Sequence, residues 1–167
     1  MPKLHAVPIT ALLLLAACVV AAPAAWADAA SGSVNYQSKA GPVVVNVTNV
    51  YLVKGPDAVS GKAIRKLIFS AKDMSAKVKS CATMSCPDGD LDAGMTVDLD
   101  AGPRINYWVV GNGQRVQYSG TAKPDALTLT TNTPQRLAGT LTIDDSTAGG
   151  AKVNVTFDAT LGKEYAK

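Results

Sequence analysis

The chain has 167 residues, of which 47% are hydrophobic and 17% charged, and its net charge is +3. This length suits one domain, and the composition is too apolar and too weakly charged for a disordered chain. The small net charge, without any cluster of Lys and Arg, also argues against a nucleic-acid partner.

The first 27 residues have the pattern of a secretory signal peptide. Lys3 precedes an apolar run over residues 11–22, and Ala25-Trp26-Ala27 provides a cleavage site with small residues at its key positions. The run is too short to cross a bilayer, which requires roughly 20 apolar residues. The sequence therefore predicts a signal peptide over residues 1–27 and no membrane span.

An alternative interpretation of the same region is a lipoprotein signal. Leu15-Ala16-Ala17-Cys18 resembles a bacterial lipobox, in which Cys18 would carry a lipid anchor. The residues after Cys18 stay apolar as far as Trp26, whereas a polar segment usually follows a lipidated cysteine. Cleavage after Ala27 is therefore preferred, and the expected location is the periplasm or the medium, with anchoring through Cys18 as the alternative.

The rest of the chain reads as a flexible lead-in over residues 28–41, rich in Ala, Ser and Gly, followed by a single domain over residues 42–167. Gly, Pro, Asn and Asp divide this domain into short runs that are β-branched or alternate between apolar and polar. The runs are residues 43–53, 63–70, 95–99, 104–110, 115–118, 127–130, 137–143 and 152–161. This pattern predicts an all-β fold, an antiparallel β-sandwich or small barrel of about eight short strands.

Several classes of catalytic site lack their residues. The only histidine, His5, lies in the predicted signal peptide, so the remaining chain has no imidazole for a Ser-His-Asp or Cys-His site or for a histidine metal site. The chain also lacks a Ser-x-x-Lys motif and a glycine-rich nucleotide loop. We therefore expect the protein not to be an enzyme.

Cys81 and Cys86 remain after removal of the signal peptide. In an oxidising compartment two such cysteines most simply form one disulfide, which here would stabilise a local turn. The alternative is a copper(I) site, because thiolate and thioether ligands suit that ion. The methionines that could contribute to it are Met74, Met84 and Met95.

Carboxylates occupy alternate positions at Asp88, Asp90 and Asp92. Oxygen ligands on alternate residues of a tight loop suit calcium. The pattern departs from an EF-hand loop, because Ala93 takes the place of its glycine and Leu99 that of its final glutamate. A calcium site is thus weighed against a solvated acidic turn.

Residues 104–110 contain the chain's most distinctive candidate surface. Strand alternation can place Arg104 and Trp108 together on an exposed face, with Tyr118 joining them across a hairpin at Gly111-Asn112-Gly113. Trp and Arg are typical of protein interfaces. In the opposite register Trp108 is buried and Tyr107 exposed, and the sequence leaves the two registers open.

These observations favour a periplasmic or secreted binding module without catalytic activity. A protein partner is preferred, as for an inhibitor, an immunity protein or a component of an envelope assembly. The alternatives are a carrier of calcium, copper or a small ligand, and a pilin-like structural subunit. Calcium is the one cofactor considered.

Overall fold

A computed structural model describes residues 28–166, so the predictions concerning the signal peptide, cleavage after Ala27 and lipidation of Cys18 lie outside the described residues. Within this range the strands follow the two-residue alternation of the sequence: Val43, Val45 and Val47 are buried, and Val44 between them is exposed. The strands are β1 (Ala29–Ser38), β2 (Gly41–Pro56), β3 (Ala63–Ser70), β4 (Gly94–Leu99), β5 (Ile105–Gly111), β6 (Val116–Ala122), β7 (Leu127–Asn132), β8 (Arg136–Asp144) and β9 (Ala151–Glu164).

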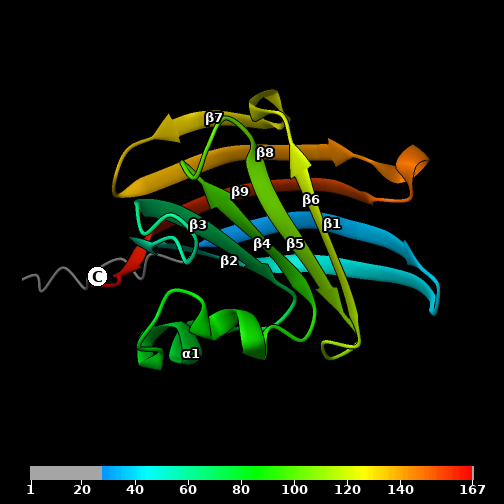
Figure 1. Ribbon diagram of the computed structural model, residues 1–167, viewed down its shortest axis with the longest axis horizontal. Helices are drawn as coiled ribbons and strands as arrows, with labels where there is room; N and C mark the ends of the chain where they lie inside the picture. Colours follow the sequence, from blue (N-terminus) through cyan, green and yellow to red (C-terminus); the bar gives the residue numbers. More distant parts are fainter. Residues whose placement is uncertain (1–27, 167) are drawn as a thin grey trace, which may run out of the picture.

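The nine strands form one continuous sheet in the order β6-β5-β4-β3-β2-β1-β9-β8-β7. The sheet is curled into a half-barrel, with β3 to β6 crossing over the more distant β1 and β2 (Figure 1). The all-β antiparallel prediction is confirmed. The strands belong to a single curled sheet, however, and not to the two separate sheets of a sandwich.

The prediction of a flexible lead-in over residues 28–41 is wrong, because β1 lies in the middle of the sheet. It pairs antiparallel with β2 on one side and with β9 on the other. Val34 is the one fully buried side chain of β1. The backbone N–H and C=O groups of the strand are satisfied by hydrogen bonds to the neighbouring strands on both sides. Gly32 has a φ of 136°, and a Cβ at this position would overlap the backbone of Asn154. The small residues that suggested a loop therefore allow β9 to approach closely.

The concave side of the sheet encloses the main hydrophobic core. Phe69 of β3 and Phe157 of β9 meet edge to face across it, with ring centroids 5.5 Å apart. Tyr107 of β5 is fully buried, and its hydroxyl donates a hydrogen bond to Asp145 Oδ2 at 2.5 Å. Burial raises the pKa of Tyr107 and the carboxylate of Asp145 raises it further.

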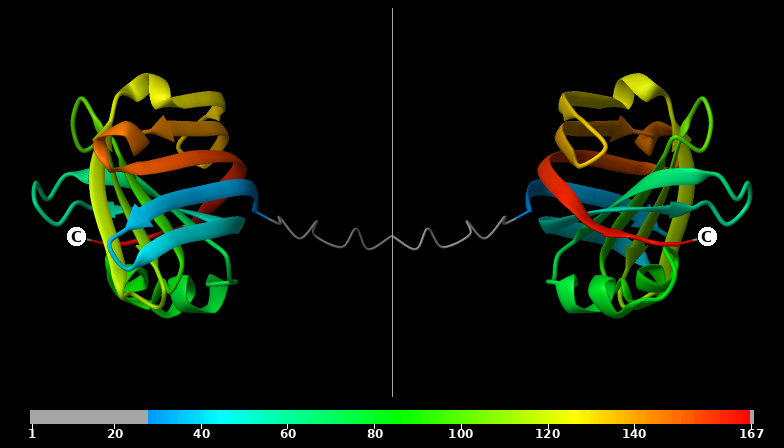
Figure 2. Two further views of the ribbon diagram at one scale, coloured as in Figure 1. Left: turned by 90° about the vertical axis from the view of Figure 1, so that its right-hand side faces the viewer. Right: turned by 90° about the vertical axis from the view of Figure 1, so that its left-hand side faces the viewer.

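The long connection between β3 and β4 covers part of the outer face. It contains the helix α1 (Ser75–Ser80) and the 3₁₀ helix η1 (Cys86–Asp90), and the other 3₁₀ helices are η2 (Pro124–Ala126) and η3 (Ser146–Ala148). The side views place α1 beneath the curled strands (Figure 2). Met74, Met84 and Leu91 of this connection pack with Ile68 of β3 in a second hydrophobic core.

The predicted disulfide is confirmed. Cys81 at the end of α1 is bonded to Cys86 at the start of η1, and their Cα atoms are 5.6 Å apart. The bond closes a local loop, and it indicates an oxidising compartment. None of the helices in residues 28–166 is long and apolar enough to cross a membrane.

Candidate functional site

A cavity of about 690 Å³ lies on the outer face of the sheet, beside the connection between β3 and β4. Lys66 of β3, Thr96 and Asp98 of β4 and Trp108 of β5 contribute the sheet side of its lining. The β2–β3 turn, the disulfide loop, the β5–β6 hairpin and the residues after β9 also contribute to the lining. The cavity thus lies where loops from several parts of the chain meet one face of the sheet.

Strand register explains why these sheet residues share one face. Lys66 is paired with Asp98, and Thr96 is paired with Trp108, across neighbouring antiparallel strands. Because successive side chains alternate between the two faces, Val97 points to the opposite, concave side. The polar outer residues are buried because the β3–β4 connection lies over them.

A buried lysine lies between two carboxylates at the cavity wall. Lys66 is only 5% exposed, and its Nζ is 2.7 Å from Asp88 Oδ2 and 3.5 Å from Asp98 Oδ1. The Asp88 contact joins η1 to the sheet. Neither Asp88 Oδ1 nor Asp98 Oδ1 has a hydrogen-bond partner within the described residues.

The electrostatic environment of the two carboxylates follows from their burial. Desolvation raises the pKa of Asp88 and of Asp98, and the positive charge of Lys66 acts in the opposite direction on both groups. Asp98 is 7% exposed and has the longer contact to Lys66. It is therefore the less well compensated of the two acids.

Gln114 fixes the β5–β6 turn against η1. Its side-chain amide donates hydrogen bonds to the backbone oxygens of Asp88 at 2.8 Å and Leu91 at 2.7 Å. Gln114 also lines the cavity. The turn and η1 are thus held in a fixed relation at this wall.

Exposed apolar side chains collect at the same cavity. Three large hydrophobic residues are exposed in the described part of the chain, and Trp108 and Val59 both line the cavity, whereas Val44 does not. Trp108 is 39% exposed and Val59, in the β2–β3 turn, is 95% exposed. Exposed apolar surface concentrated at a hollow is typical of a binding site.

The structure decides between the two registers that the sequence left open for Trp108. The side chain of Trp108 faces outward, and Tyr107 is buried. The predicted patch is nevertheless dispersed: Tyr118 borders the cavity, but its ring packs against the main core and against the tilted ring of Tyr36, with centroids 4.8 Å apart. Arg104 lies outside the cavity lining, and its guanidinium donates to Thr121 Oγ1 and to the Thr121 backbone oxygen.

The structure also separates the carboxylates of the proposed calcium loop. Each forms an ion pair with a different lysine: Asp88 with Lys66, Asp90 with Lys77 and Asp92 with Lys72. Across residues 28–166 there is no group of three or more His, Cys, Asp or Glu side chains that could hold a metal ion. The three aspartates therefore do not converge on one point.

The residues of the copper alternative are likewise spread over different environments. Both cysteines are consumed by the disulfide. Met74 and Met84 lie in the second hydrophobic core, on the outer face, whereas Met95 lies in the main hydrophobic core on the concave side of the sheet. The structure does not bring these sulfur atoms together as a ligand set.

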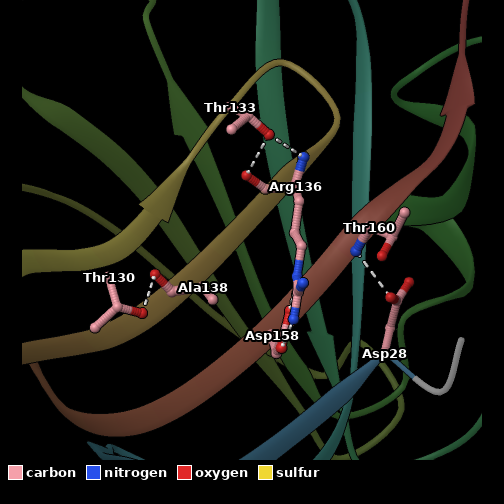
Figure 3. A network of polar contacts seen from close by, with 7 residues as sticks. All are labelled: Asp28, Thr130, Thr133, Arg136, Ala138, Asp158 and Thr160. Atoms are coloured by element: carbon pink, nitrogen blue, oxygen red, sulfur yellow. Dashed lines mark hydrogen bonds and ion pairs between the residues drawn. The ribbon is translucent and has the colours of Figure 1, made fainter.

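A second polar network on β7, β8 and β9 provides a contrast to the cavity (Figure 3). Arg136 of β8 forms a bidentate ion pair with Asp158 of β9. The Thr160 backbone N–H donates a hydrogen bond to Asp28 Oδ1 at 2.8 Å. Both partners of the ion pair are half exposed. The Arg136–Asp158 pair joins β8 to β9, and the Asp28 contact holds the start of β1 against β9.

Sequence reasoning missed Lys66, which lies between charged and apolar residues in Ala63–Ser70. The one feature of the sequence that could have pointed to Lys66 is its place in a strand otherwise rich in large apolar side chains.

In comparisons with known proteins, no protein-family model, no curated protein and no solved structure gives a match. The residues of the cavity are therefore the basis of the functional argument.

Proposed function

We propose that the protein is a non-catalytic binding protein of the periplasm or the secreted fraction, and that the outer-face cavity holds a small organic ligand. The observation that carries this proposal is the coincidence of a hollow of about 690 Å³ with two of the three exposed large hydrophobic residues in the described chain. Small-molecule sites are commonly of this size, mainly apolar, and supplied with a few placed polar groups.

The arrangement favours a small ligand over the protein partner that the sequence suggested. A protein interface usually groups its Trp and Arg residues in one patch. Here Trp108 lines a concavity, while Arg104 is engaged with Thr121. A polypeptide that inserts one side chain into the cavity is the second candidate, supported by the exposure of Val59 at the lining.

The compartment belongs to the same proposal. Support comes from the signal-like residues 1–27 and from the Cys81–Cys86 disulfide, which is typical of an oxidising environment. Residues 28–167 contain no histidine, which supports a role without acid–base catalysis by imidazole.

A nuclear magnetic resonance titration tests the site. Phenylbutanol, a neutral molecule with a terminal phenyl ring, is added to the isotope-labelled full chain. We expect saturable shifts of the Trp108 indole N–H and the Gln114 side-chain amide, because both residues line the cavity. The side-chain amide of Gln37, which does not line it, should be unaffected.

Two variants make the test specific. Trp108→Ala should abolish the saturable shifts at Gln114, whereas Val44→Ala, which also removes an exposed apolar side chain but outside the cavity, should preserve them. Shifts that never saturate, or that survive unchanged in Trp108→Ala, would contradict a ligand site at this cavity.

A further inference from the structure

The charged residues of the cavity lining are unbalanced. The lining contains three aspartates, Asp57, Asp88 and Asp98, and a single lysine, Lys66. The whole chain has the opposite balance, with 16 Lys and Arg against 13 Asp and Glu. The excess of negative charge is thus a local property of the cavity.

Two of these carboxylates, those of Asp88 and Asp98, share ion pairs with the one lysine. Lys66 is nearer to Asp88, at 2.7 Å, than to Asp98, at 3.5 Å. A single ammonium group cannot neutralise two carboxylates. The remaining negative charge falls mainly on Asp98, which is 7% exposed and whose Oδ1 has no hydrogen-bond partner within residues 28–166.

A buried carboxylate oxygen without a hydrogen-bond partner, beside a lysine that is closer to another acid, is costly unless something supplies a further donor and positive charge. Asp98 lines the cavity, so a molecule within the cavity is placed to do so. Asp57, at the β2–β3 turn, adds a second negative charge to the lining; its pKa is lowered by hydrogen bonds from Ser60. Both groups disfavour an anionic ligand.

The cavity lining also offers aromatic and aliphatic surface to a ligand. The half-exposed indole of Trp108 offers an aromatic face, which attracts cations as well as apolar groups. Met84 and Val110 add aliphatic surface nearby. The lining thus combines uncompensated negative charge with an apolar wall.

We infer that the cavity is selective for small organic cations, in which a primary ammonium group is held by Asp98 and an apolar body packs against Trp108. The inference rests on the proposed function, because it names the chemical class of the ligand for the same cavity. It differs from the metal alternatives in requiring an N–H donor attached to an apolar body.

Isothermal titration calorimetry on the full chain tests this selectivity near neutral pH. The probes are phenylbutylamine, phenylbutanol and phenylbutanoate, which share one carbon skeleton and carry a positive, a neutral and a negative terminal group. We expect the amine to bind about tenfold or more tightly than the alcohol, since a charge-assisted hydrogen bond is considerably stronger than a neutral one. The carboxylate should bind most weakly.

Substitutions connect the preference to named groups. Asp98→Asn keeps the shape of the side chain and should reduce the preference for the amine over the alcohol to within about threefold. The matched control is Asp144→Asn, which removes an exposed aspartate outside the cavity that is paired with Lys152, and which should leave the preference intact. If Asp98→Asn does not fold, Asp57→Asn takes its place and should lower the preference to a smaller extent.

The outcomes separate this inference from the proposed function. Equal binding of amine and alcohol, lost in Trp108→Ala, would overturn the cation selectivity and leave the ligand site in place. An amine preference that persists in Asp98→Asn would overturn the assignment of the ammonium group to Asp98. Absence of saturable binding by all three probes would overturn both proposals.

Discussion

Replacing Lys66 by methionine is the most direct test of the energetic role of the buried charge cluster. Methionine preserves much of the volume of the lysine stem but removes the ammonium group that lies between Asp88 and Asp98. One buried carboxylate, Asp98, and one partly buried carboxylate, Asp88, then lose their positive partner. We expect the variant to be markedly destabilised at neutral pH, because desolvated charges without compensation disfavour the folded state.

The magnitude follows from the burial of the three groups. Removing one partner of a buried ion pair usually costs about 3–5 kcal/mol. The side chain of Asp88 is 34% exposed, so water screens part of its charge and the lower end of that range, about 3 kcal/mol, applies. For a domain of about 140 residues this corresponds to a fall in Tm of roughly 10 °C.

The assay is thermal unfolding followed by circular dichroism, with Lys72→Met as the matched control. Lys72 is also paired with an aspartate, Asp92, but both side chains are more than half exposed. Its replacement should change stability by less than about 1 kcal/mol. Equal melting temperatures for the two variants would refute the claim that the charge of Lys66 contributes more to stability than an exposed charge does.

The pH dependence of the Lys66→Met variant supplies a second check. Burial raises the pKa values of Asp88 and Asp98 above the ordinary 3.8, so the folded state binds protons more readily than the unfolded state. The loss of stability of the variant relative to the unmodified protein should therefore be greatest near neutrality and should shrink as the pH falls towards and below 3.8. A deficit that grows on acidification would contradict this mechanism.

Three further results are expected. Reduction of the disulfide should lower the free energy of unfolding by about 2 kcal/mol, the chain-entropy value for so short a loop, as measured by chemical denaturation with and without reductant; an unchanged midpoint would refute this. Gly120→Ala should destabilise by about 1–3 kcal/mol because its Cβ would come 2.6 Å from Tyr107 Cζ, whereas Gly89→Ala, whose Cβ meets nothing within 4 Å, should not show this overpacking cost. Arg136 lowers the pKa of Asp158, so the stability difference between Asp158→Asn and the unmodified protein should be present near neutrality and disappear as the pH falls below 3.8; melting curves across this range would show no such convergence if the pair were absent in solution.

The elements that could be predicted from the sequence are those in which local pattern and burial agree. β2 shows this well, because its valines alternate with polar residues and one face is buried. β1 escaped detection because it is stabilised by two neighbouring ladders and close backbone packing, which leave little trace in side-chain hydrophobicity.

The candidate site shows a similar division. Strand alternation is enough to place Asp98 on the face of β4 opposite Val97, which lies in the main core. Its burial depends on where the β3–β4 connection lies, and no local pattern specifies that position. Lys66, Asp88 and Asp98 come from segments far apart in the chain, so their juxtaposition is a property of the tertiary fold.

The central position of β1 has a consequence for the order in which the chain can assemble. Its register with β2 involves neighbouring segments, but Ala29 also pairs with Asp158, near the other end of the chain. Contacts so distant in sequence close large loops and are associated with slow folding. One edge of β1 therefore stays unpaired until β9 is in place, and the pairing of the first strand is completed by the ninth.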